Sequence, residues 1–136
     1  MRYLILPLVI ALAGCAQTPA QEAAATQRRA AEQQGLAKEL AGLVPDKPTM
    51  CLTNFRTRQL KAYGPTLIYS EGRNLKYRSD TAGGCEGVAR GDILVTVSPT
   101  GQLCSGDIAR TVSPTSRIPS GSCSLGEFIP YRKPRS

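Results

Sequence analysis

The sequence predicts an all-β domain: a small disulfide-stabilised barrel or sandwich of about six short antiparallel strands, preceded by an Ala/Gln-rich helical tether. From residue 51 onward, short apolar or alternating runs are separated by Gly, Pro, Ser and Asn, which is typical of small β domains. Four of the five cysteines lie in this region, which has two Phe and no Trp and therefore a small core. We divide the chain into a signal peptide (residues 1–14), a tether (15–49) and a β domain with a basic tail (50–136).

The first fourteen residues have the features of a secretory signal. Arg2 provides the positive charge, and an apolar run from Leu4 to Leu12 is too short to span a bilayer, which takes about 20 residues. The segment Leu12-Ala13-Gly14-Cys15 resembles the bacterial lipoprotein precursor pattern. That resemblance implies that Cys15 is lipidated, becomes the first residue of the mature chain and attaches it to a membrane.

An ordinary secretory cut after Ala13 is the alternative. It would leave Cys15 as an unpaired thiol beside four other cysteines in an oxidising compartment, so the odd number of cysteines favours lipidation. Ala16, in place of Asp, resembles the residue that directs lipoproteins to the outer membrane. We therefore expect a lipid-anchored protein of the outer membrane that faces the periplasm.

The tether is rich in Ala, Gln and Glu and favours a helix. Thr18-Pro19-Ala20-Gln21 matches a capping box with proline at the first helical position, and Pro45 ends the pattern. Gly35 interrupts the helix, and the larger apolar residues form only one narrow stripe. We expect a partly ordered tether, with a spacer or partner-binding helix as the alternative. The stripe consists of Leu36, Leu40, Leu43 and Val44.

Six segments alternate or are continuously apolar in the way that strands require. We expect turns at Tyr63-Gly64-Pro65 and Ser98-Pro99-Thr100-Gly101, and a hairpin around Glu71-Gly72-Arg73. The expected strands are Arg56–Ala62, Thr66–Ser70, Asn74–Ser79, Ile93–Ser98, Asp107–Ser113 and Glu127–Tyr131.

An internal repeat supports two of these strands. Residues Gly91–Thr100 recur as Gly106–Thr115 with eight of ten positions identical, which predicts two equivalent turn–strand–turn units. Asp92 and Asp107 follow the glycines and are expected to be turn residues. Arg90-Gly91-Asp92 spells an adhesion tripeptide, but the second copy lacks the arginine, so we interpret it as a turn as well.

The four domain cysteines predict two disulfides. Four thiolates on zinc would need closely spaced pairs, which are absent from the sequence. Three pairings are possible. We favour Cys85 with Cys104 and Cys51 with Cys123.

Several cysteine-containing segments together resemble a family of small, uncharacterised proteobacterial envelope proteins, grouped as a domain of unknown function. The resemblance covers about residues 50–131 and implies a four-cysteine envelope domain without a known activity, cofactor or catalytic residue. The segments that carry it are Cys51-Leu52, Gly84-Cys85-Glu86-Gly87, Leu103-Cys104-Ser105-Gly106-Asp107 and Cys123-Ser124-Leu125-Gly126-Glu127-Phe128.

Catalysis is not predicted. The sequence has no His, which removes the usual general base and zinc ligand. No phosphate-binding glycine loop or paired-carboxylate motif is recognisable. We expect no enzyme activity, no cofactor and no metal.

Charge suggests the main functional alternative. Residues 51–136 contain twelve Lys and Arg against six Asp and Glu, a net charge of +6, whereas residues 15–50 contain four of each sign. Alternation places Arg56 with Arg58, and Lys76 with Arg78, on one side of their strands. We expect a non-catalytic envelope lipoprotein that is a structural or protein-interaction module. The alternative is a binding module for an anionic glycan, lipid head group or lipopolysaccharide phosphate, with no nucleic acid as partner.

Overall fold

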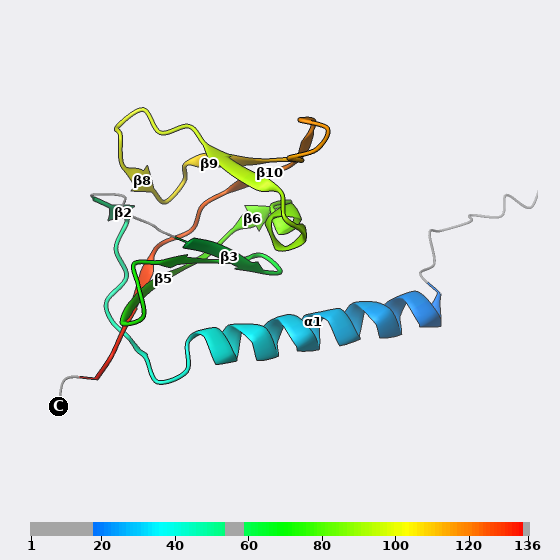
Figure 1. Cartoon of the computed structure of the whole chain (residues 1–136), viewed down its shortest axis with the longest axis horizontal. Helices are drawn as coiled ribbons and strands as arrows, with labels where there is room; N and C mark the ends of the chain where they lie inside the picture. Colours follow the sequence, from blue (N-terminus) through cyan, green and yellow to red (C-terminus); the bar gives the residue numbers. More distant parts are fainter. Residues whose placement is uncertain (1–17, 54–58, 135–136) are drawn as a thin grey trace, which may run out of the picture.

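The computed structural model describes residues 18–53 and 59–134, and it shows a two-layer β sandwich with one helix on its outside (Figure 1). The helix, α1 (Pro19–Glu39), lies against one sheet, and the second sheet lies on the opposite side of the core. All strand pairs are antiparallel, and within the described residues neither large sheet closes into a barrel. The predicted β class is therefore confirmed, in its sandwich form.

The first sheet has five strands in the order β1-β11-β5-β4-β3, and a pair of very short strands, β2 (Cys51–Leu52) and β8 (Leu103–Cys104), lies beside the sandwich. The second sheet has four strands in the order β6-β10-β9-β7, with the short 3-10 helix η1 (Glu86–Arg90) between β6 and β7 along the chain. The strands of the first sheet are β1 (Val44–Pro45), β3 (Gln59–Tyr63), β4 (Thr66–Ser70), β5 (Leu75–Asp80) and β11 (Ile129–Arg132). Those of the second sheet are β6 (Ala82–Gly83), β7 (Ile93–Thr96), β9 (Ile108–Val112) and β10 (Pro119–Ser124).

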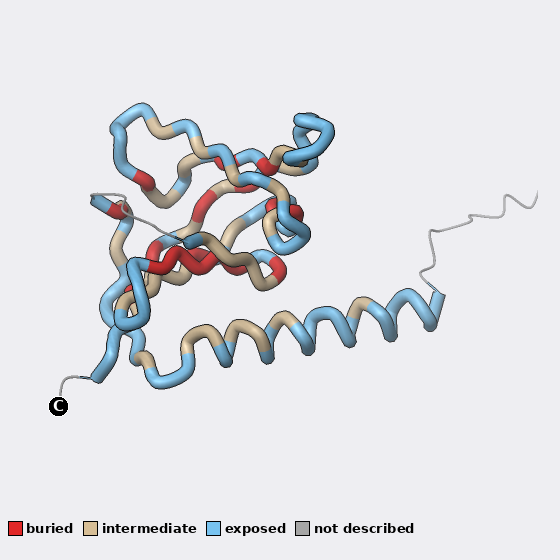
Figure 2. The backbone as a smooth tube through the Cα atoms, viewed as in Figure 1, coloured by how far each residue is buried: buried red, intermediate tan, exposed pale blue. Residues whose placement is uncertain are grey.

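The core lies between the two large sheets. Strand β4 is buried along its whole length (Figure 2), because Leu67 and Tyr69 point into the core while Ile68 points to the other face, towards α1. The ring of Tyr69 meets Phe128 edge-on at a centroid distance of 5.8 Å. The second sheet contributes Ala109 and Cys123 to the same cluster.

Helix α1 is continuous and packed, which corrects the expectation of a partly ordered tether. The capping box is present, with Thr18 and Gln21 bonded reciprocally. Gly35 does not interrupt the helix. A Cβ there would lie 2.7 Å from Cε1 of Tyr63, so the glycine allows the helix to approach the sheet closely. The helix ends at Glu39, before the expected Pro45, and the chain then turns through Gly42 at φ +75°.

Most predicted strands are confirmed within two or three residues, and one major strand was missed. The predicted turns of the first sheet are also confirmed, with Gly64 and Gly72 both at positive φ. Residues 54–58, the start of the first predicted strand, lie outside the described residues. The missed strand, β10, is rich in Ser, contains Pro and Gly, and lacks apolar alternation, yet it lies inside the second sheet.

The two copies of the repeat become neighbouring strands. β7 pairs with β9 in a register that sets Ile93 opposite Val112, and the glycines that open the copies, Gly91 and Gly106, both have positive φ (98° and 89°). Asp107 accepts a hydrogen bond from the Cys104 N–H at 2.8 Å. The repeat therefore encodes two equivalent turn–strand units, as expected.

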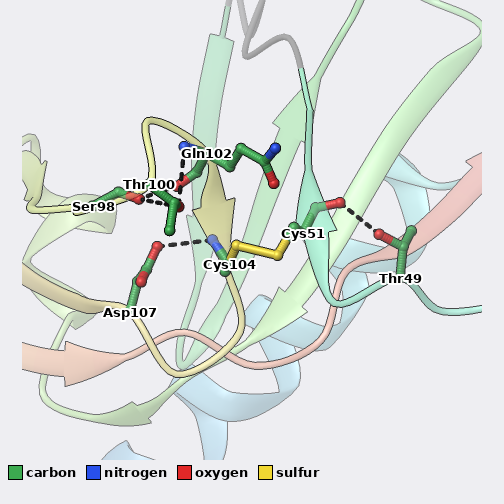
Figure 3. Close-up of a disulfide and its surroundings, with 7 residues drawn as sticks. All are labelled: Thr49, Cys51, Ser98, Thr100, Gln102, Cys104 and Asp107. Carbon is green, nitrogen blue, oxygen red and sulfur yellow. Dashed lines mark hydrogen bonds between the residues drawn. A yellow bond between two sulfur atoms is a disulfide. The ribbon is translucent and has the colours of Figure 1, made fainter.

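All four domain cysteines form disulfides, but the favoured pairing was wrong. The bonds are Cys51–Cys104 and Cys85–Cys123, 53 and 38 residues apart. Cys51 and Cys104 face one another across the β2–β8 pair, where Thr49 and Asp107 bond to the adjoining backbone (Figure 3). Cys85 caps η1 next to β10, which carries Cys123. The pairing follows from which segments lie side by side in the fold, and the spacing of the cysteines along the chain does not show this.

Candidate functional site

The predicted cation face lies beneath helix α1. Lys76 and Arg78 point to the same side of β5, as strand alternation predicts, and the sheet register places Ser70 and Ile68 next to them on β4. Lys76 is only 15 % exposed and Arg78 31 %. Arg56 and Arg58 lie outside the described residues. The expected open face of four cations is therefore, in its described half, partly covered by the helix.

A carboxylate from α1 binds two lysines of the first sheet, Lys61 and Lys76. Glu39 Oε2 accepts hydrogen bonds from Lys61 Nζ at 2.7 Å and from the Tyr63 hydroxyl at 3.0 Å, while Oε1 contacts Lys76 Nζ. Lys76 Nζ also donates to the Glu39 carbonyl at 2.7 Å, which satisfies a backbone oxygen at the helix C-terminus. We call Glu39, Lys61, Tyr63 and Lys76 the helix latch.

The electrostatics of the latch favour an ionised glutamate. Burial by itself would raise the pKa of Glu39, but the hydrogen bonds from Lys61, Lys76 and Tyr63 outweigh burial and lower the pKa to about 2. The bond to Glu39 raises the pKa of the Lys61 ammonium. Glu39 therefore stays ionised, and bonded to the sheet, across the physiological pH range.

Arg78 has a carboxylate partner of its own. Its guanidinium contacts both oxygens of Asp80, with Nη2–Oδ2 at 3.0 Å and Nε–Oδ1 at 3.1 Å. This hydrogen bonding raises the pKa of Arg78. Asp80 also accepts a bond of 2.6 Å from Thr66. An external anion at Lys76 or Arg78 would have to displace a carboxylate of this chain.

A second basic surface, which the sequence analysis missed, lies between α1 and η1. A groove of about 660 Å³ there is lined by Arg28 and Arg29 from the helix and Arg90 from η1, with Glu32 and Glu86 also on its wall. None of the three arginines has an ion pair within the part of the chain that the structure describes. We call it the arginine groove. The Arg28-Arg29 pair was the available sequence signal, but it lay in a segment interpreted as a tether.

The outer face of the second sheet is apolar. Side chains alternate along β7 and β9, so that Leu94 and Ala109 point to the core while Ile93, Val95 and Ile108 point to solvent. Ile93 and Ile108 are 54 % and 52 % exposed, and Val97, directly after β7, is 75 % exposed. We call Ile93, Val95, Val97 and Ile108 the apolar face. The sequence analysis predicted a strand at Ile93–Ser98 but did not identify an exposed apolar face on it.

The apolar face and helix α1 lie on opposite sides of the molecule. Ile68 is directly opposite Lys61, which bonds to Glu39 of α1, so the helix covers this face of the first sheet. The second sheet lies on the other side of the core (Figure 1), and the apolar face is its solvent-exposed surface. Each layer adds about 10 Å. The two surfaces are therefore separated by the whole thickness of the sandwich.

The acidic residues of the repeat serve the structure. Asp92 Oδ2 accepts a hydrogen bond of 2.5 Å from the Ser120 hydroxyl, and this bond joins β10 to the turn before β7. The same hydroxyl lies 2.9 Å from Oγ1 of Thr111 on β9. With Gly91 in the left-handed region, Arg90-Gly91-Asp92 forms the turn that we expected. Among the residues described, no cluster of His, Cys, Asp and Glu could hold a metal ion.

No family model matches the chain, and no curated protein or solved structure is significantly similar to it. The resemblance to four-cysteine envelope proteins therefore stays a prediction. Over residues 18–53 and 59–134, no helix is both long and apolar enough to cross a membrane.

Proposed function

We propose that this chain is a non-catalytic envelope lipoprotein, anchored to the outer membrane by a lipid on Cys15, which works as a protein-interaction module. The apolar face carries the proposal. A small domain with few large apolar residues places Ile93, Val95, Val97 and Ile108 in solvent on one surface, and contiguous exposed apolar surface of this kind is a feature of interaction sites.

The position of the anchor supports a protein partner over the bilayer itself. Residues 15–17 can span at most about 10 Å, so a lipid on Cys15 keeps the start of α1 close to the membrane. The apolar face lies on the far side of the sandwich from α1. It is thus directed away from the helix that carries the anchor and towards periplasmic proteins.

Lipidation is tested by the intact mass of the mature protein. We expect a chain that begins at Cys15 and carries acyl chains, and we expect Cys15→Ala to leave the membrane fraction. A mature chain that begins at Gly14 without added lipid would show that the ordinary secretory cut is used.

The docking surface is tested by site-specific photo-crosslinking in cells. A photoreactive residue at Val95 should give one discrete crosslinked envelope protein, and so should one at Ile108. The matched control is Gln34, which is exposed on α1. Equal crosslinking from Gln34, or none from Val95 and Ile108, would remove the apolar face as the docking surface.

The arginine groove favours anion binding as a second candidate function. Arginine forms paired hydrogen bonds with phosphate and carboxylate groups, and the groove is lined by three arginines, from α1 and η1, that have no ion pair among the described residues. The Cys15→Ala protein, which has no lipid anchor of its own, should bind vesicles that contain phosphatidylglycerol at low salt, with affinity that falls steeply as salt rises. Neutral phosphatidylcholine vesicles should not bind.

A pair of triple variants locates that binding. Replacing Arg28, Arg29 and Arg90 by Ser should abolish it, whereas replacing Arg73, Arg132 and Lys133 by Ser removes the same charge elsewhere and should preserve most of it. Equal losses in both variants would indicate a general charge effect. Unchanged binding in both would leave Lys76 and Arg78, or the undescribed Arg56 and Arg58, as the site.

A further inference from the structure

We propose that strand β7 is completed by an extended segment of another protein, which adds as a further strand and carries apolar residues on both sides of a central acidic residue. The inference rests on the proposed function, because it names the chemistry of the partner that the apolar face accepts. It assigns two recognition elements: the open edge of β7 and the guanidinium of Arg110.

The edge of β7 is available for pairing. β7 is the last strand of its sheet, and among the described residues it pairs only with β9, so that alternate backbone N–H and C=O groups point outward without a strand partner there. Other sheet edges are less suitable. β1 and β6 have two residues each, and the edge strand of the first sheet, β3, lies close to η1.

β7 also lacks the features that keep an exposed edge from pairing. Natural edge strands are often protected by lysine, proline or a bulge. The residues of β7, Ile93-Leu94-Val95-Thr96, include no charge and no proline, and their pairing with β9 is regular. An added strand would continue the apolar face, because its outward side chains would lie beside Ile93, Val95 and Val97.

Arg110 determines the charge of the partner. It lies directly opposite Val95 on the outer face, is exposed, and forms no ion pair among the described residues. The neighbouring acids are already engaged, Asp92 by Ser120 and Asp107 by the Cys104 N–H. An arginine reaching across β7 can meet a glutamate on the added strand, two strand spacings or about 9.6 Å away.

A second copy of this chain fits the surface less well. Pairing β7 with β7 of another copy would bring two Arg110 side chains onto one continuous sheet face with no acidic partner between them. It would also join two domains whose residues 51–136 each carry a net charge of +6. Charge complementarity therefore favours an acidic segment of a different protein.

The experiment titrates the lipidated mature protein in detergent with two capped peptides. The first contains valine, threonine, glutamate, threonine and valine in that order, and the second has lysine in place of the glutamate. Because the order is the same in both directions, either strand orientation can bind. We expect the glutamate peptide to shift the amide NMR signals of residues 93–97 and to slow their hydrogen exchange, and the lysine peptide to do neither.

Three variants complete the test. Arg110→Glu should lower the affinity for the glutamate peptide by about tenfold or more and create binding of the lysine peptide. Val95→Lys places a charge in the apolar face and should abolish both. Arg73→Glu, in the β4–β5 turn, is the matched charge reversal and should bind like the wild type.

The outcomes separate this inference from the proposed function. If the glutamate peptide leaves residues 93–97 unaffected, or if Arg110→Glu binds as the wild type does, strand addition by an acidic segment is wrong. If sedimentation shows a wild-type dimer that Val95→Lys dissociates, the occupant is a second copy. In either case, in-cell crosslinks from Val95 and Ile108 to an envelope protein would still support the interaction module, and their absence would overturn both.

Discussion

Glu39 connects a helix and a sheet that have few apolar contacts with one another. No residue of α1 is fully buried, and its packing on the sheet involves the half-buried Leu36, which lines a pocket with Tyr63 and Thr66, and the close approach at Gly35. The carboxylate receives three side-chain donors from β3 and β5. A single side chain thus makes the ion pairs that join the helix to the sheet.

The helix latch predicts a pH dependence of stability. The pKa of Glu39 falls from its ordinary value of 4.5 to about 2 on folding. A depressed pKa stabilises the fold fully above the unfolded value, and the contribution is lost as pH falls through the folded value, so the loss lies between pH 4.5 and 2. It amounts to about 3 kcal/mol.

Glu39→Gln tests this by urea denaturation at several pH values. We expect it to be less stable than wild type by about 2–3 kcal/mol at pH 7, because two lysines lose their carboxylate, and to lack this loss between pH 4.5 and 2. Glu127→Gln, at an exposed position, is the control and should follow the wild-type profile. Parallel profiles for Glu39→Gln and wild type would contradict the latch.

Gly121 is a second residue on which the packing depends. A Cβ at this position would lie 1.9 Å from the carbonyl oxygen of Gly84, a backbone atom that cannot move without shifting β6. Gly121→Ala should therefore lower the free energy of unfolding by about 1–3 kcal/mol. Gly84→Ala is the neighbouring control, since its Cβ would meet nothing closer than 3.7 Å, and it should be almost neutral in thermal unfolding. An equal loss of stability in the two variants would show that the close contact between residue 121 and the Gly84 carbonyl does not cause the destabilisation.

At the scale of elements, periodicity predicted the strands that alternate and failed where contacts between distant segments decide. Thr66–Ser70 was predicted with its observed bounds, and the hairpin with β5 follows from its turn. β10 could not be predicted from its own residues, because its Pro, Gly and Ser residues show no apolar alternation, and its place in the sheet depends on pairing with β6 and β9. Its only apolar core side chain is Cys123.

For the candidate sites, too, alternation did not show which contacts form between distant segments. Alternation correctly put Lys76 and Arg78 on one side of a strand, but it could not show that α1 would cover that side, since helix docking depends on Glu39 and Gly35 from a segment of low apolar content. Ile93, Val95 and Val97 also alternate along their strand, but which face of β7 is buried depends on the side on which the first sheet packs, and the strand's own residues do not show this.

At the scale of the whole molecule, the two disulfides differ in burial and in loop length. Cys51–Cys104 closes the longer loop, 53 residues, but lies beside the sandwich with both cysteines half-buried. Cys85–Cys123 closes 38 residues and lies in the core, where the cysteines are 1 % and 4 % exposed. On the chain-entropy account both restrict the unfolded chain by about 4 kcal/mol, so loop length alone predicts nearly equal effects.

Because it is buried in the core, the Cys85–Cys123 disulfide should contribute more to stability than the Cys51–Cys104 disulfide. Replacing Cys85 and Cys123 together by Ala also removes two sulfur atoms from the cluster around Ala109, so a cavity cost is added to the lost constraint. We expect this double variant to lose more stability in urea denaturation than Cys51→Ala with Cys104→Ala, and to melt at the lower temperature. Because the domain core is small, we expect both variants to be unfolded or nearly so at 37 °C, with the difference measured at 10–20 °C where stability is greatest. A larger loss for the Cys51–Cys104 variant would show that loop length, and not burial, sets the contribution of each bond.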